Sequence, residues 1–272
     1  MIYNSDGKTV NNHGINYEYR RDSVTGAFYT IVNIPQVDSD GNKQYPFVLW
    51  DNYPNGGNKS VIQMNRTRNF RVAINAGRFA APYGGTTDVT GMPQGIVIQN
   101  GENKTGTVTG SSGDRVLTIN NNGELGYANV TDSPATLIAS GIVSAVSGFV
   151  PIIVNYNNIE ESDSSITYPT DSAGSVDSQR QILGQYNNGD YIIISTEGRN
   201  NQGGGFFTVP QLQELCKSLG LKFAFLLDGG GSTQTVIGQK QLNQPYSGEL
   251  PEGRHVPTFI VFNGTTEFST TG

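Results

Sequence analysis

The sequence has a single cysteine, Cys216, so it cannot form an internal disulfide bond. Charged residues make up only 15% of the 272 residues, and 17 basic against 23 acidic side chains leave a formal net charge of -6. No lysine or arginine cluster offsets this charge, which argues against a nucleic-acid partner. The chain lacks an apolar run of the roughly 18 residues that cross a bilayer, and its first ten residues do not resemble a signal peptide. We therefore expect no membrane insertion and no signal-directed secretion.

Asparagine, glycine, serine and threonine supply most of the polarity and separate many short apolar runs. This pattern favours a β-rich protein over a helical one. The runs expected to form strands lie within residues 15–50 and at 70–75, 95–100, 115–120, 141–154, 191–195, 222–228 and 258–262. Residues 120–127, NNNGELGY, are typical of a hairpin turn between two strands.

Residues 209–219 form the one segment with clear helical periodicity. Its apolar residues recur at i, i+3, i+4 and i+7 on one face: Leu212, Leu215, Cys216 and Leu219. Thr208 and Gln211 are spaced for a capping box, and Gly220 suits a left-handed stop. On this stripe, Cys216 is better explained as a buried structural thiol than as a nucleophile. We expect an α+β fold, a mostly antiparallel β structure with one or two helices packed on the sheet.

Two polar segments each have a functional and a simpler interpretation. Residues 38–41, DSDG, begin like a calcium loop but lack its third ligand and closing glutamate, which favours a hairpin turn. Residues 157–179 are acidic, rich in serine and without periodicity. A lid over a site and a mobile surface insertion both fit such a segment.

Three consecutive glycines, Gly229, Gly230 and Gly231, follow Asp228 at the end of an apolar strand, and Ser232 follows them. Glycine is costly to order, so three together indicate either unusual backbone angles or close approach of another group. A carboxylate at a strand end, beside exposed amides and a hydroxyl, is well placed to line a substrate site. The simpler alternative, a tight turn capped by aspartate, explains one glycine better than three.

Two other expected strands end in the same way. Residues 191–195 lead to Glu197 and Arg199, and residues 70–75 lead to Asn75 and Arg78, each with a glycine beside them. An arginine next to a carboxylate suits a bidentate grip on phosphate, although a rim salt bridge explains it as well. Three strand ends of this kind predict that their polar residues lie together along one rim of the β structure.

In their order along the chain, these motifs resemble those of the phosphodiester glycosidase family. The most specific is L-D-G-G-G-S after a helix and an apolar strand, matched by Leu227 to Ser232. Residues 75–79 are similar to N-G-G-x-F, and residues 197–199 to D-G-R. Weaker matches are Pro93, Gly95, Ile98 and Gly101, then Arg180 with Gly184, and Arg254 with Val256. The resemblance covers about residues 70–262, so we expect residues 61–272 to form the family-like domain. Residues 1–60 would add leading strands to it or form a small appended β segment.

The resemblance implies hydrolysis of a sugar-1-phosphodiester, with Asp228 as nucleophile or base and Glu197 as the second carboxylate. The substrate-binding residues that it implies are Asn75, Arg180, Arg199, Gly229, Gly230, Gly231, Ser232 and Arg254. No cofactor is required, and calcium or another divalent cation at Asp228 or Glu197 has no support from ligand spacing. No histidine and cysteine cluster indicates zinc.

Other polar residues receive simpler interpretations. Ser232 has no nucleophile elbow around it and is expected to act as a turn or hydrogen-bonding residue. His255 is better explained by packing than as a general acid, and His13 lies outside the resemblance. Two departures from the family pattern bear on activity: Ala76 replaces a glycine, and Glu197 replaces an aspartate.

The rival hypothesis is a non-catalytic carbohydrate-binding component of a phage tail or baseplate, and a third is a self-assembling structural protein with a vestigial site. A polar surface poor in lysine and the absence of a signal peptide suit a phage tail protein, including one that cleaves wall polymers such as teichoic acid. The expected partners are therefore a glycan or sugar-phosphate, together with a second copy of the chain or other phage tail proteins. The expected location is the virion or the cytoplasm.

Overall fold

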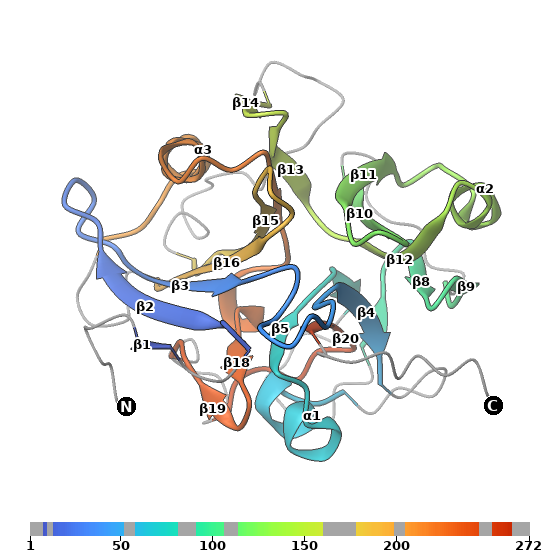
Figure 1. The fold of residues 1–272 in the computed structure, drawn as a ribbon, viewed down its shortest axis with the longest axis horizontal. Helices are drawn as coiled ribbons and strands as arrows, with labels where there is room; N and C mark the ends of the chain where they lie inside the picture. The colour runs from blue at the N-terminus through green and yellow to red at the C-terminus, as the bar shows by residue number, and fades with distance from the viewer. Residues whose placement is uncertain are drawn as a thin grey trace.

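The computed structural model describes residues 8–9, 13–51, 58–80, 91–105, 114–159, 178–198, 205–244 and 252–262. Their strands form three antiparallel sheets and a short two-stranded ribbon (Figure 1). With three helices on the outside of these sheets, the fold is α+β and rich in β structure, as the sequence predicts. Within the described residues, no helix is long and apolar enough to cross a membrane.

The first sheet has eight strands, and the strand that leads to Asp228 lies near its middle. Its order is β1 (Lys8–Thr9), β2 (Asn16–Arg21), β3 (Phe28–Ile34), β16 (Tyr191–Thr196), β15 (Gln181–Gln185), β17 (Phe223–Leu226), β13 (Val150–Val154) and β14 (Asn157–Asn158). β3, from the first fifth of the chain, is thus hydrogen-bonded to β16, which follows more than 150 residues later.

The second and third sheets have five strands each. The second is ordered β19 (Lys240–Gln241), β18 (Thr235–Ile237), β5 (Val72–Asn75), β20 (Thr258–Phe262) and β4 (Pro46–Trp50). The third is ordered β11 (Leu125–Asn129), β10 (Arg115–Asn120), β12 (Ile142–Ser147), β8 (Val97–Gln99) and β9 (Glu102–Asn103). The ribbon pairs β6 (Phe79–Ala80) with β7 (Met92–Pro93).

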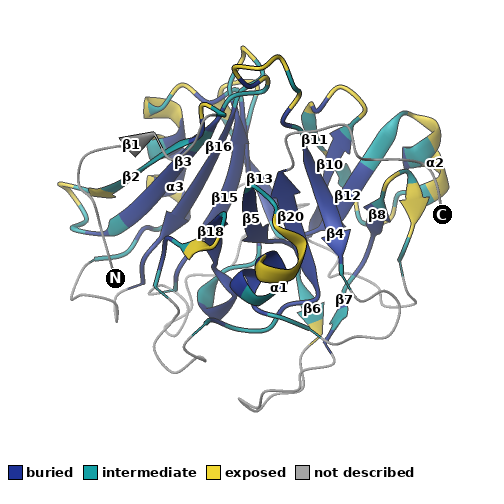
Figure 2. Ribbon diagram, turned by 60° about the horizontal axis from the view of Figure 1, so that its bottom comes forward, coloured by how far each residue is buried: buried dark blue, intermediate teal, exposed yellow. Residues whose placement is uncertain are grey.

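One hydrophobic core lies between the three sheets, and each sheet contributes to it, for example through Val32, Ile74 and Leu117. Many strands are buried on both faces because a helix covers the outer side (Figure 2). In β16, Tyr191 and Ile193 face the shared core, whereas Ile192 and Ile194 face the side covered by α3. Such strands read as continuous apolar runs for this reason.

Three helices pack outside the sheets: α1 (Val61–Arg68) on the second, α2 (Pro134–Ala139) on the third and α3 (Val209–Ser218) on the first (Figure 1). The expected helix is confirmed as α3, with Thr208 and Gln211 in a capping box and Gly220 at φ +77°. Cys216 is fully buried on its inner face, and burial raises the pKa of the thiol to about 12, as suits a structural residue. With α1 and α2, the described residues have three helices, one more than the one or two that the sequence predicts.

The expected hairpin at residues 120–127 is confirmed between β10 and β11. The apolar run at 141–154 is not one strand but two, β12 in the third sheet and β13 in the first. Gly148 marks the change, because a Cβ there would lie 2.9 Å from the Phe225 ring.

Candidate active site

Asp228 lies where the chain leaves the first sheet and meets the second. Directly after β17, the Leu227 amide donates to the Gln181 carbonyl in the first sheet at 2.9 Å. The Asp228 amide instead donates to the Ala76 carbonyl, just past β5, at 3.1 Å. The Asn75 side-chain amide donates to the Asp228 carbonyl at 2.7 Å. Both main-chain polar groups of Asp228 are thus held by the second sheet.

The glycines after Asp228 form a tight turn. A Cβ on Gly229 would lie 2.7 Å from the Gln179 carbonyl oxygen, and Gly230 has φ +58°. The Gly229 amide donates to Asp228 Oδ1 at 3.1 Å, and the Gly230 amide donates to the Gln179 carbonyl at 2.8 Å. Close approach and backbone angle therefore account for these two glycines, and both amides are engaged inside the protein. The substrate-binding role that the resemblance implies for these glycines stays a prediction.

The Asp228 carboxyl is half-buried and lies near the positive charges of Arg254 and Arg78. Burial raises its pKa above the ordinary value for aspartate, and four groups oppose this: the Ser232 hydroxyl, the charges of Arg254 and Arg78, and the Gly229 amide. Arg254 Nη1 also lies 3.4 Å from the Ser232 oxygen. A desolvated carboxyl with nearby cations at a rim is typical of an acid or base in catalysis.

Glu197 and Arg180 lie on the same rim as Asp228. Because β16, β15 and β17 are neighbours, the residue after β16, the residue before β15 and the second residue after β17 are at one end of the sheet. The Arg180 amide donates to the Thr196 hydroxyl at 2.8 Å. Arg180 is buried, and its Cδ would lie 3.8 Å from a Cβ on Gly229.

Glu197 is more deeply buried than Asp228, with 1% of its surface exposed. Its Oε2 accepts from the Gln179 side chain at 3.0 Å, and its Oε1 accepts from the Gln244 amide at 3.2 Å. Gln179, which sequence reasoning did not single out, thus contacts Glu197 through its side chain and the glycine turn through its carbonyl. Both carboxylate oxygens of Glu197 are held within the protein.

The second sheet contributes Asn75, at the end of β5, and Arg254, just before β20. Asn75 is buried, and besides its bond to Asp228, its Oδ1 accepts from the Gln234 amide at 3.0 Å. Ser232 and Gly231 are buried under the same turn. Ser232 therefore contacts both Asp228 and Arg254 at this rim, and Asn75 holds the backbone of Asp228.

Arg78 and two residues around it add to this set. The Arg78 guanidinium lies 3.2 Å from the Asp114 carboxylate and stacks over the Phe149 ring at 4.4 Å from its centre. The sequence places Arg78 inside a family-like motif, but nothing in the pattern links it to Asp114, 36 residues away in the chain. Arg199 and residues 160–177 of the expected lid lie outside the described residues.

Residues 38–41 form the expected hairpin turn. The Asp38 carboxylate accepts from the Asp40 and Asn42 amides at 3.0 and 2.8 Å and lies 2.9 Å from Arg71 Nη1. Burial alone would raise the pKa of Asp38, but the bonds from Asn42, Arg71 and Asp40 lower it to about 2. His13, Asp38 and Asp40 gather as metal ligands do, but Arg71 already supplies a cation to the central carboxylate.

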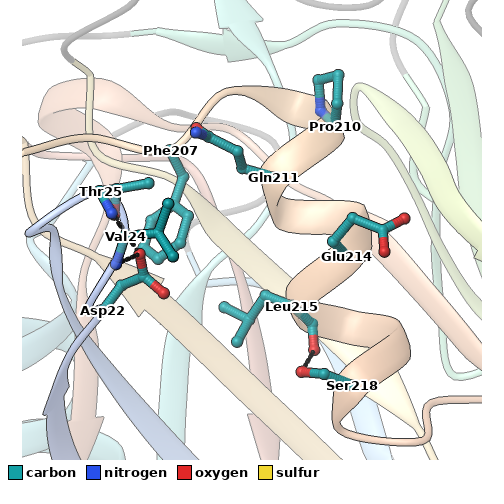
Figure 3. A pocket seen from close by; sticks show the side chains of 9 residues that line it. All are labelled: Asp22, Val24, Thr25, Phe207, Pro210, Gln211, Glu214, Leu215 and Ser218. Atoms are coloured by element: carbon teal, nitrogen blue, oxygen red, sulfur yellow. Dashed lines mark hydrogen bonds between the residues drawn. The ribbon is translucent and has the colours of Figure 1, made fainter.

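A separate cavity of about 380 Å³ lies between the β2–β3 turn and α3 (Figure 3). Phe207 and Leu215 give it apolar walls, while Asp22 and Glu214 lie at its rim. Asp22 accepts from the Val24 and Thr25 amides, and Glu214 accepts from Asn158, so both carboxylates are engaged. None of the rim residues around Asp228 lines this cavity.

His255 follows Arg254, and its Nε2 is buried without a hydrogen-bond partner among the described residues. The charge of His255 acts on the Glu252 carboxylate. These contacts give it no place beside the Asp228 carboxyl.

A family model described as phosphodiester glycosidase matches residues 68–263, more than half of the chain. The chain belongs to the phosphodiester glycosidase family. The match spans the rim: it includes Asn75, Arg78, Arg180, Glu197, Asp228 and Arg254.

Solved structures share the fold of this chain. The catalytic domain of zebrafish N-acetylglucosamine-1-phosphodiester alpha-N-acetylglucosaminidase, auto-inhibited by its pro-peptide, is 20% identical with a TM-score of 0.70, over 96% of this chain and 87% of that one. A hypothetical protein from Synechocystis is 16% identical with a TM-score of 0.61, over 91% of this chain and 62% of that one. At these identities the likeness establishes the fold of this phosphodiester glycosidase domain.

A curated relative is the SPbeta prophage-derived uncharacterized protein YomE of Bacillus subtilis (strain 168). It is 42% identical over 64 residues, which are 24% of this chain and 10% of YomE. This phosphodiester glycosidase chain thus matches only a tenth of that relative's length.

Proposed function

We propose that this protein hydrolyses the bond between a sugar and the phosphate of a sugar-1-phosphodiester. The observation that carries the proposal is the half-buried Asp228 carboxyl near the charges of Arg254 and Arg78, at the rim that the family match spans. Water replaces the phosphate at the sugar's anomeric carbon: the carbon–oxygen bond to phosphate breaks, the phosphomonoester leaves, and the sugar gains a hydroxyl. A phosphate leaving group needs little protonation, so a cationic clamp matters more than a strong acid.

In this proposal the Asp228 carboxylate attacks the anomeric carbon or takes the proton of the attacking water. Either role requires the ionised form, which the neighbouring arginines favour against the effect of burial. Arg180, Arg199 and Arg254 bind the phosphate, and Ser232 orients Asp228 and Arg254 through its hydroxyl.

We propose a positioning role for Glu197 in place of the catalytic one that the resemblance implies. Its carboxylate is buried and accepts hydrogen bonds from Gln179 and Gln244. A carboxylate that is held in this way fixes the wall of the site, since Gln179 in turn accepts the Gly230 amide. Asn75 acts similarly, through its bonds to Asp228 and Gln234.

As the substrate we propose a phosphodiester-linked wall polymer such as teichoic acid, with the protein acting as part of a phage tail. The prophage origin of the relative YomE supports this, together with the low charge of the chain. The alternative from another class is a carbohydrate-binding tail component that retains the fold without catalysis. Ala76 in place of a glycine, directly beneath Asp228, is the feature that favours it.

The test measures sugar released from UDP-N-acetylglucosamine and from purified teichoic acid. We expect release by the wild type, a loss of about 10²–10⁴-fold in Asp228→Asn, and unchanged release in Asp132→Asn, a matched change near α2. No release from either substrate, with wall polymer still bound in a sedimentation assay, would favour the binding component. Neither release nor binding would count against both and favour the structural protein.

A further inference from the structure

Arg78 leaves the second sheet at a rigidly held point. Its amide donates to the Ser147 carbonyl at 3.2 Å, and its carbonyl accepts from the Gln94 amide at 2.9 Å. A Cβ on the preceding Gly77 would lie 2.3 Å from the Ser147 carbonyl oxygen, so the chain passes directly against the end of β12. The side chain of Arg78 therefore starts from backbone that two other segments fix.

The Arg78 guanidinium is held by an ion pair at one edge and by an aromatic ring on one face. The Asp114 carboxylate lies 3.2 Å from Nη1, and the Phe149 ring lies under the plane at 4.4 Å. Asp114 and Phe149 are adjacent because the Arg115 amide donates to the Phe149 carbonyl at 2.8 Å. An ion pair alone would fix the charge, whereas the ion pair together with the stacked ring also fixes the plane of the fork.

Backbone hydrogen bonds bring the segment around Arg78 close to the segment around Asp228. Ala76, two residues before Arg78, accepts the Asp228 amide, and Leu226, two residues before Asp228, accepts the Phe149 amide at 3.3 Å. Arg78 and Asp228 thus start from neighbouring backbone segments at the junction of the three sheets, and the charge of Arg78 acts on the Asp228 carboxyl. The Arg78 side chain is 31% exposed, while that of its partner Asp114 is 3% exposed. The pair therefore presents its cation, and not its anion, to solvent.

We propose that Arg78 binds the anionic phosphate of the substrate beside Asp228, with Asp114 and Phe149 as the positioning residues that fix its plane. This deepens the proposed function and rests on it. Neither the resemblance to the family nor the pattern of strand ends assigns a role to Arg78 or to its two partners. A planar guanidinium with its orientation fixed suits the bidentate geometry of phosphate oxygens, and a lysine in its place would not.

The first measurement is the affinity of the full chain for inorganic phosphate by calorimetry. We expect Arg78→Met to weaken it by about tenfold to a hundredfold, and Arg78→Lys to recover only part of this loss. Arg66→Met is the matched control, since it removes an equal charge from an arginine paired with Glu252 beside α1. The double variant Arg78→Gln with Asp114→Asn keeps the result interpretable where Arg78→Met alone fails to fold, because it leaves no buried carboxylate unpaired.

The second measurement compares kcat/KM for a sugar phosphodiester with that for an uncharged nitrophenyl glycoside of the same sugar. We expect Arg78→Met to lower the first by about tenfold more than the second, whereas a structural role would lower both equally. Phosphate binding needs no turnover, so it tests Arg78 even where the hydrolase proposal fails. Failure of the wild type to bind phosphate, or equal affinities of Arg78→Met and Arg66→Met, would overturn the proposal.

Discussion

Replacing Gly229 with alanine would place a methyl carbon 2.7 Å from the Gln179 carbonyl oxygen. Ordinary contact begins near 3.4 Å, so one of the two backbones must move by about 0.7 Å. Neither moves freely. Gln179 accepts the Gly230 amide at 2.8 Å, and Asp228 is bonded to Ala76 at 3.1 Å.

The cost follows from these contacts. Overpacking against fixed backbone costs about 1–3 kcal/mol, and loss of the Gly230 bond to Gln179 adds about 1 kcal/mol. We therefore expect Gly229→Ala to lower the free energy of unfolding by about 2–4 kcal/mol. For a chain of this size each kcal/mol corresponds to a fall in Tm of about 2–4 °C.

Differential scanning calorimetry measures the effect, with Gly220→Ala as the control. Unlike Gly229, whose φ is -120°, Gly220 has a positive φ of +77°. No atom lies within 4 Å of its Cβ position, so alanine there costs only about 1–2 kcal/mol of backbone strain. Sugar release should fall further in Gly229→Ala than in Gly220→Ala, because the Gly229 amide orients Asp228 Oδ1. A Tm for Gly229→Ala at or above that of Gly220→Ala would refute the close-approach argument.

Four more outcomes follow from the same structure. The raised pKa of Asp228 should put the acid limb of the pH–rate profile above the range of an ordinary aspartate. Arg254→Met should move that limb to still higher pH, because the Arg254 charge favours the ionised carboxyl. An unshifted limb in that variant would contradict the role of the Arg254 charge. Whereas activity should rise with pH over this range, stability should fall. Relative to Asp228→Asn, the wild type should lose free energy of unfolding as pH rises through the raised pKa of Asp228, as measured by urea unfolding at several pH values. The lowered pKa of Asp38 predicts stability that is present above about pH 4 and lost as pH falls toward 2, so a wild-type curve parallel to that of Asp38→Asn in acid would be inconsistent with it. Thr208→Ala should lower the free energy of unfolding by about 1 kcal/mol through loss of the α3 cap, whereas Ser133→Ala, at an α2 cap without a side-chain bond, should change it far less in the same assay.

The sequence predicts α3 and the strand after it because local signals agree there: an apolar stripe, a capping box and a terminal glycine. α1 has the same capping box, formed by Ser60 and Gln63, but its buried face includes Asn65 and gives no clear stripe. Attention to that S-x-x-Q signal would have found it. The division of residues 141–154 between two sheets is set by packing of Gly148 against Phe225, which no local pattern records.

The rim itself is predictable because β16, β15 and β17 are neighbours and each carries a polar residue at its end. What the sequence leaves open is which polar groups face the substrate. Glu197 and the Gly229 amide look available in the sequence, yet the structure engages both through Gln179, Gln244 and Asp228. The partnership of Arg78 with Asp114 and Phe149 arises from the meeting of separate sheets, and contacts of that kind depend on topology alone.

The junction of the sheets also determines when the site around Asp228 is completed during synthesis of the chain. Asp228 is bonded to Asn75 across 153 residues, and Arg254 arrives only 26 residues later. β20, which follows Arg254, pairs with β5 and so anchors the second sheet. Contacts over such separations form late, since long loops must close first. A nascent chain therefore carries Asp228 without its full set of cations until β20 has left the ribosome, and incomplete chains have no finished site.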